Sequence, residues 1–200
     1  MFFGPLTARC CAFFGLLVVL ASCDQANEAG NRPTTPAAIV PTLATAAASR
    51  ACGEHGRLQT ELFGALVGHL DWSAAELECS GMPRPDGAGA RFRFAGQVVG
   101  ADRRIAIIIA LPGLERDAAD AELGSKVTLI DEGSGRFFST WDLDSCWTDI
   151  TSLVRTDDSG DRFNIGGTLY CVAPLAEVNG DASVSISELI FAGVLDWSDK

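Results

Sequence analysis

The chain has 200 residues, and its 26 acidic side chains outnumber its 15 lysines and arginines, which gives a net charge of −11. Such a charge disfavours nucleic acid, whose phosphates require a basic surface, and it equally disfavours electrostatic adhesion to anionic lipid. A solvated acidic surface is the simplest interpretation, and we expect no nucleic-acid partner.

The chain begins with a segment typical of a secretory signal peptide. Arg9 is the only cation among residues 1–9, and an apolar run of 11 residues follows at positions 10–20. A membrane-spanning helix needs about 20 apolar residues, so this shorter run suits the core of a signal peptide that is removed after export. The best later candidate for a span, residues 105–111, has the length of a strand.

The apolar run ends in Leu20-Ala21-Ser22-Cys23. These residues match the lipobox of bacterial lipoprotein precursors, in which an aliphatic residue and two small residues precede a cysteine, so the N-terminus resembles that family. The resemblance implies transfer of diacylglycerol to the Cys23 sulfur, cleavage before Cys23, and acylation of the new amine by a fatty acid such as palmitate. Two or three acyl chains anchor a protein stably without a membrane span. An ordinary signal peptide with a chance cysteine is the alternative.

The residues after the lipobox predict a location and a tether. Asp24 resembles the inner-membrane retention signal of enterobacterial lipoproteins, which favours the periplasmic face of the inner membrane over the outer membrane. The following segment is rich in Pro, Thr and Ala, and it can form no packed core. We therefore expect a signal peptide at residues 1–22, a lipidated cysteine and flexible linker at 23–50, and one folded domain at 51–200.

The cysteines of the domain predict two disulfides. Of the seven cysteines in the chain, two lie in the signal peptide and Cys23 is the lipidation site, which leaves four. An even number in an exported chain indicates disulfides, although four cysteines allow three pairings. We favour Cys52–Cys79 and Cys146–Cys171, because both close local loops of similar size. A zinc site is the alternative, but no C-x-x-C or paired Cys/His spacing supports it.

Strand patterns recur at short spacing through the domain, separated by clusters of Gly, Pro, Asn and Asp. Residues 91–94 alternate arginine with phenylalanine, which predicts a strand with one face in the core and one in water. Residues 105–111 are continuously apolar and mostly β-branched, as in a central strand buried on both faces.

Further along the chain, two hairpins, a last strand and one short helix are expected. The hairpins have their turns at residues 131–135 and 157–161, the last strand begins at residues 184–186, and the helix covers residues 114–123, with Gly124 as its C-cap. Eight or nine strands with this turn spacing predict a mainly β fold, a single antiparallel β-sandwich with two disulfides and one short helix at most.

Residues 177–188 resemble an EF-hand loop, especially that of dockerins. Oxygen-bearing side chains fall at loop positions 1, 3, 5, 9 and 12, which suits Ca²⁺. The side chains to test as ligands are Asn179, Asp181 and Glu188, and no other cofactor is expected. Ala182 departs from the pattern, because the loop requires glycine there. A hairpin turn at the Asn-Gly pair is the alternative.

Two other groups of side chains are candidate sites. Trp141 and Trp147 stand close in sequence to Asp142 and Asp144, an aromatic and acidic combination that suits sugar binding. Core aromatics beside turn acids are the alternative. Acids also gather at the tip of the second expected hairpin, where they form either a metal site or, more simply, a solvated turn: Asp157, Asp158 and Asp161.

The sequence gives catalysis little support. It contains no G-x-S-x-G, H-E-x-x-H or P-loop motif, and its two histidines, His55 and His69, lie outside any such pattern. A pair of carboxylates can hydrolyse glycosides, but so acidic a chain offers many chance pairs. We expect an envelope-anchored binding or structural module whose partner is an envelope protein or a glycan. A calcium-binding module is the alternative, and a carboxylate-based hydrolase the third.

Overall fold

The computed structural model of the chain describes residues 52–119, 121–156 and 160–198. The expected signal peptide, Cys23 and the linker lie outside the described residues. The chain divides into two compact units, and the second, Val40–Lys200, contains everything that is described. Within this part of the chain, no helix is long and apolar enough to cross a membrane.

Apart from one helical residue, Cys52, the secondary-structure elements of the described residues are strands, which confirms the predicted mainly β fold. The described residues form thirteen strands, more than the eight or nine expected, because several are only three or four residues long. Their bounds are β1 Arg57–Gly64, β2 Gly68–Ser73, β3 Glu78–Pro83, β4 Ala90–Gln97, β5 Arg104–Leu111, β6 Glu122–Gly124, β7 Lys126–Asp131, β8 Arg136–Ser139, β9 Cys146–Arg155, β10 Arg162–Cys171, β11 Leu175–Glu177, β12 Ser183–Ile186 and β13 Leu189–Asp196.

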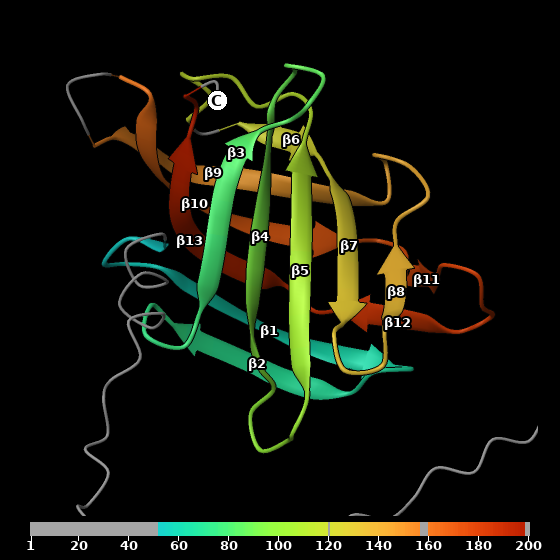
Figure 1. The fold of residues 1–200 in the computed structure, drawn as a ribbon. Helices are drawn as coiled ribbons and strands as arrows, with labels where there is room; N and C mark the ends of the chain where they lie inside the picture. Colours follow the sequence, from blue (N-terminus) through green and yellow to red (C-terminus); the bar gives the residue numbers. More distant parts are fainter. Residues whose placement is uncertain (1–51, 120, 157–159, 199–200) are drawn as a thin grey trace, which may run out of the picture. The chain divides into compact units, whose positions relative to one another are not determined.

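The strands pair antiparallel in one sheet that folds over into two layers. Its order is β3-β4-β5-β7-β8-β11-β12-β1-β13-β10-β9-β6, with β2 also paired to β1. Figure 1 shows β3, β4, β5, β7 and β8 in one layer and β1, β2, β13, β10 and β9 in the other, with the strands of the two layers running across one another. This is the expected β-sandwich, made from a single continuous sheet.

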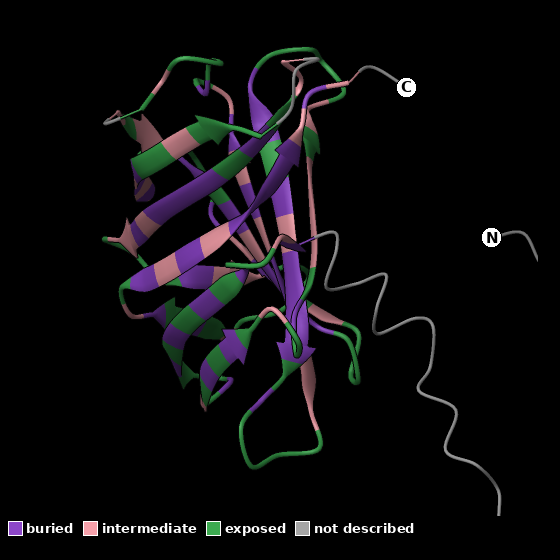
Figure 2. Ribbon diagram, turned by 90° about the vertical axis from the view of Figure 1, so that its left-hand side faces the viewer, coloured by how far each residue is buried: buried purple, intermediate pink, exposed green. Residues whose placement is uncertain are grey.

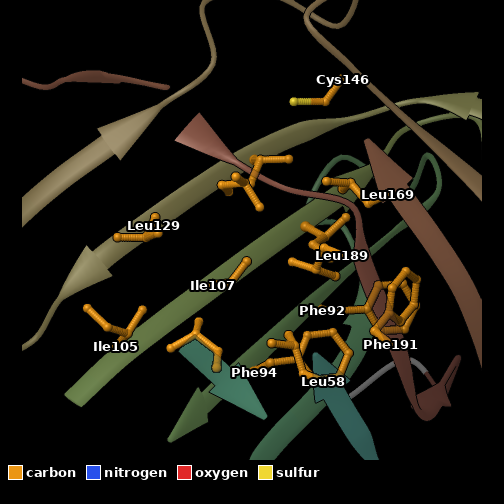
Figure 3. Close-up of a cluster of buried hydrophobic side chains, with 14 of the residues drawn as sticks. Leu58, Phe92, Phe94, Ile105, Ile107, Leu129, Cys146, Leu169, Leu189 and Phe191 are labelled. Atoms are coloured by element: carbon orange, nitrogen blue, oxygen red, sulfur yellow. The ribbon is translucent and has the colours of Figure 1, made fainter. Parts of the chain in front are cut away.

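The core lies between the two layers. Along most strands buried residues alternate with more exposed ones, as the stripes in Figure 2 show. Phe92 and Phe94 from one layer meet Phe191 from the other, with ring centroids 6.2 and 5.6 Å from that of Phe191 (Figure 3). The layers also meet at Gly81 of β3, where a Cβ atom would overlap the carbonyl oxygen of Val194, so this approach requires glycine.

Two predicted features of the chain are wrong in detail. Residues 114–119 contain turns, residues 122 and 123 already belong to β6, and Gly124 ends that strand instead of capping a helix. Leu114 is buried by a turn and residues 122–124 pair with β9, so tertiary pairing overrides the local helix propensity of this alanine-rich segment. The outer face of β5 is also only partly covered, since Ile108 and Ala110 are half-buried.

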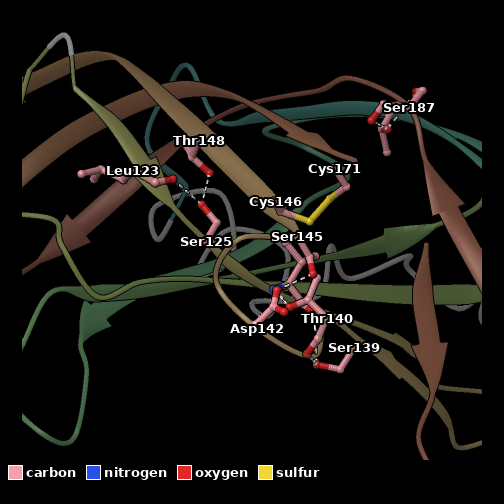
Figure 4. The surroundings of a disulfide bond; sticks show 12 residues. Leu123, Ser125, Ser139, Thr140, Asp142, Ser145, Cys146, Thr148, Cys171 and Ser187 are labelled. Atoms are coloured by element: carbon pink, nitrogen blue, oxygen red, sulfur yellow. Dashed lines mark hydrogen bonds between the residues drawn. A yellow bond between two sulfur atoms is a disulfide. The ribbon is translucent and has the colours of Figure 1, made fainter. Parts of the chain in front are cut away.

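Both predicted disulfides are present. Cys52–Cys79 joins the segment before β1 to β3, and Cys146–Cys171 joins directly opposed residues of β9 and β10. Beside the second disulfide, the fully buried hydroxyls of Ser125 and Thr148 share a hydrogen bond of 2.6 Å (Figure 4). The disulfide fixes the register of β9 and β10, and that register positions the side chains of the candidate site below.

Candidate functional site

The segment expected to resemble an EF-hand loop forms a hairpin between β11 and β12. Asn179 stands in the turn with a φ of 63°, and the Glu177 amide donates to the Ala182 carbonyl at 2.8 Å. The Glu177 carboxylate accepts a hydrogen bond of 2.6 Å from Arg136, and this bond lowers the pKa of Glu177. The turn therefore has the geometry of the hairpin alternative.

The three expected calcium ligands do not all lie together. Asn179 and Asp181 are exposed in the turn, whereas Glu188 lies at the other end of β12. Asp181 and Glu188 are seven positions apart in the sequence, which corresponds to roughly 23 Å in an extended chain. In the described part of the chain, no group of three or more His, Cys, Asp or Glu side chains is arranged to hold a metal ion.

Of the other two candidate groups, the structure describes only part of the first and spreads the second over a loop and a strand. Asp157 and Asp158 lie outside the described residues, and Asp161 forms an ion pair of 2.7 Å with Arg116. Trp141 is 83% exposed in the loop between β8 and β9, where Asp142 accepts a hydrogen bond from Ser145 and Asp144 is exposed.

Trp147 stands on the outer face of β9, away from the sandwich core, with three other side chains. We call this group the aromatic–carboxylate cluster: Glu122, Trp147, Asp149 and Tyr170. Trp147 and Asp149 alternate with the buried inward residues of β9, while Tyr170 of β10 is directly opposite Trp147. The two rings are stacked, with centroids 6.1 Å apart and planes inclined by 21°.

A hydrogen bond ties the cluster together across three strands. The Tyr170 hydroxyl on β10 donates to Glu122 on β6 at 2.6 Å, spanning β9 between them. This bond is the main cause that raises the pKa of Tyr170 to about 12, followed by desolvation and by the charges of Glu122 and Asp149. The phenol therefore remains a neutral donor at physiological pH.

The two acidic residues of the cluster occupy opposed positions on neighbouring strands. Glu122 and Asp149 are directly opposed in the pairing of β6 and β9, and like charges in that position are destabilising. Opposite Trp147 on β6 stands Gly124, where a Cβ atom would come within 3.2 Å of the Leu143 carbonyl oxygen. The absence of a side chain at Gly124 thus lets the loop before β9 approach this face.

A shallow groove of about 680 Å³ continues along the same face of the sheet. Its floor contains Gly166 and Gly167, where the pairing of β9 and β10 shifts by one residue, and a Cβ atom on Gly166 would lie 2.8 Å from the Ser152 hydroxyl. The remaining lining includes four hydroxyl side chains, three residues of β13, and charged or titratable residues at or just before the start of β1: Ser73, Thr151, Ser152, Thr168, Ile190, Phe191, Ala192, Glu54, His55 and Arg57.

The groove adjoins the aromatic–carboxylate cluster, because Thr168 lines the groove and pairs directly with Asp149. Together they present aromatic rings, hydroxyls and carboxylates on one face, an arrangement suited to hydrogen bonding and stacking with a polar ligand. His69, the other histidine, lies elsewhere, 3.8 Å from Glu61.

Sequence reasoning named Trp147 but missed Tyr170, Glu122 and Asp149. One signal for Tyr170 was present in the sequence. If Cys146 and Cys171 are paired in a hairpin, Trp147, which follows the first cysteine, lies opposite Tyr170, which precedes the second. Glu122 had no such signal, since its segment was expected to be helical.

Comparisons of the chain with protein-family models, with curated proteins and with solved structures find no match.

Proposed function

We propose that this chain is a lipid-anchored lipoprotein of the bacterial cell envelope whose β-sandwich presents a binding surface. The observation that carries the proposal is Leu20-Ala21-Ser22-Cys23 at the end of an apolar run of signal-peptide length. Cys23 would carry the diacylglycerol and form the N-terminus of the mature protein.

The cysteine chemistry of the domain supports export. Its four cysteines form two disulfides, and such bonds persist in oxidising compartments such as the periplasm. In the cytosol these cysteines would be held reduced. The pairing also leaves Cys23 without a disulfide partner among the domain's cysteines, as lipidation of its sulfur requires.

The charge of the chain supports a lipid anchor over electrostatic adhesion. A net charge of −11 is repelled by an anionic membrane surface, so acyl chains must hold the protein there. Asp24 after the anchor favours the periplasmic face of the inner membrane. The outer face of β9 and β10 is then the surface offered to an envelope protein or glycan.

The test is Cys23→Ala in the producing bacterium, with Cys11→Ala as a matched control, because Cys11 lies in the same signal peptide but outside the lipobox. We expect the wild type and the control to be processed, labelled by radioactive palmitate and found with membranes. Cys23→Ala should lose the label and the processing before residue 23. Unchanged processing and membrane association in Cys23→Ala would contradict the anchor.

A second variant tests the location. Asp24→Ser should move the mature protein from inner-membrane to outer-membrane fractions on a density gradient, since it removes the retention signal without touching the lipidation site. An unchanged distribution would contradict the assignment to the inner membrane and leave the anchor itself unaffected.

A further inference from the structure

We infer that the outer face of β9 and β10 binds a neutral linear oligosaccharide, which stacks on Trp147 and Tyr170 and continues along the groove over Gly166. This inference rests on the proposed binding function and names its class of ligand. It is carried by three independent features of the face, namely its aromatic rings, its opposed carboxylates and its open, hydroxyl-lined groove.

The aromatic rings provide a stacking surface on an otherwise polar face. Trp147 and Tyr170 are both half-buried, so part of each ring is in contact with solvent. Aromatic rings bury large apolar areas while their polar atoms remain free to hydrogen-bond, which suits the alternating C–H faces and hydroxyl edges of a sugar. Tyr170 is held in place by its bond to Glu122, so little conformational freedom is lost on binding.

The opposed carboxylates supply acceptors that a sugar can satisfy. Glu122 and Asp149 carry like charges at directly paired positions, a local cost of the kind that proteins retain at functional sites. Each ionised carboxylate offers about four acceptor positions, and the Tyr170 hydroxyl occupies one of those on Glu122. Sugar hydroxyls would donate to the remaining positions and offset the repulsion.

The groove extends this surface along β10 and then across the sheet, since its lining comes from β9, β10, β13, β1 and the end of β2. Tyr170 and Gly166 are four residues apart on β10, a distance of about 13 Å along a strand. Between them Thr168 contributes a hydroxyl, and Gly166 has no side chain of its own, so the Ser152 hydroxyl lies close to it, 2.8 Å from where a Cβ atom would stand. An extended ligand of several rings fits this length, whereas a single small molecule would use only one end.

Charge selects among glycans. The chain carries a net charge of −11, and both carboxylates of the cluster lie on the binding face. A polyanionic glycan would be repelled by these carboxylates and by the net charge, with Arg57 the one arginine in the described groove lining to oppose this, whereas a neutral glycan would meet the rings and the hydrogen-bonding groups without that repulsion. The ligand class is therefore a neutral oligosaccharide.

The test uses the mature lipidated protein in a detergent without sugar groups. Tryptophan fluorescence is followed during titration with cello-, chito-, xylo-, manno- and laminarihexaose, and with polygalacturonate as the anionic probe. We expect at least one neutral hexaose to bind and polygalacturonate not to bind. Trp147→Ala should weaken that binding by about tenfold. The matched control is Phe137→Ala, because Phe137 is 44% exposed on the other layer, and its affinity should equal that of the wild type.

Two outcomes overturn the inference: no neutral hexaose binds, or binding is equal in the wild type and in Trp147→Ala while both variants keep the wild-type melting temperature. Tyr170→Phe separates the roles of ring and hydroxyl, since it keeps the ring and should retain more affinity than Trp147→Ala. Failure of the oligosaccharide test leaves palmitate labelling at Cys23 untouched, whereas failure of labelling with binding intact would contradict only the anchor.

Discussion

Removing either disulfide should destabilise the domain by nearly the same amount. Cys52–Cys79 and Cys146–Cys171 are separated by 27 and 25 residues in sequence. By the chain-entropy relation, cross-links closing such loops each contribute about 3.5 kcal/mol and differ by about 0.1 kcal/mol. For a domain of this size the melting temperature should fall by about 7–14 °C in each double cysteine-to-alanine variant.

The assay is urea unfolding of the purified, oxidised chain and of the two double variants. Besides the loss of about 3.5 kcal/mol in unfolding free energy, the slope m should rise, because an unfolded chain without a cross-link exposes more surface. Reduction of the wild type is the control and should lower stability by more than either double variant. A loss below about 1 kcal/mol with an unchanged slope would refute the reasoning that the bridges stabilise the domain by restricting its unfolded chain.

Three further predictions concern the cluster, the core and the β11–β12 turn. Tyr170 is the only tyrosine, so the ultraviolet titration of phenolate should show a midpoint near 12, lowered in Glu122→Gln. Because this pKa is raised on folding, the associated stability is present below about pH 10 and is lost as the pH rises towards 12; a midpoint at 10 would contradict the hydrogen bond. Phe191→Ala should lower the free energy of unfolding by about 3–5 kcal/mol in urea, since the ring is 1% exposed, whereas Phe137→Ala should change it by less than about 0.5 kcal/mol; equal effects would contradict the two-layer packing. Calcium should leave the melting temperature unchanged, because Asp181 lies in a hairpin turn, and a rise that disappears in Asp181→Ala would contradict this.

The layers of the fold could be predicted because strand patterns are local. The alternation in residues 91–94 places Phe92 and Phe94 in the core, where each is 1% exposed. The two disulfides could be predicted because local loops were the simplest pairing. What local patterns could not supply was the identity of short strands such as β6 and β11, since three residues form a strand only when a neighbour pairs with them.

The candidate site was only partly predictable for the same reason. Trp147 stands out as an aromatic near acids, but its true neighbours come from other strands. Tyr170 reaches it through the register of β10, and Glu122 through the pairing of β6 with β9. The expected acidic partners Asp142 and Asp144 instead stay in the loop, because the chain turns between them and the strand.

The most direct test of the central claim is the mass of the N-terminal peptide of the mature protein, isolated from membranes. We predict a peptide that begins at Cys23 and carries a diacylglycerol on the sulfur, with or without a further acyl chain on the amine, and no peptide from residues 1–22. A mature protein that begins at any other residue, or that begins at an unmodified Cys23, would contradict the account.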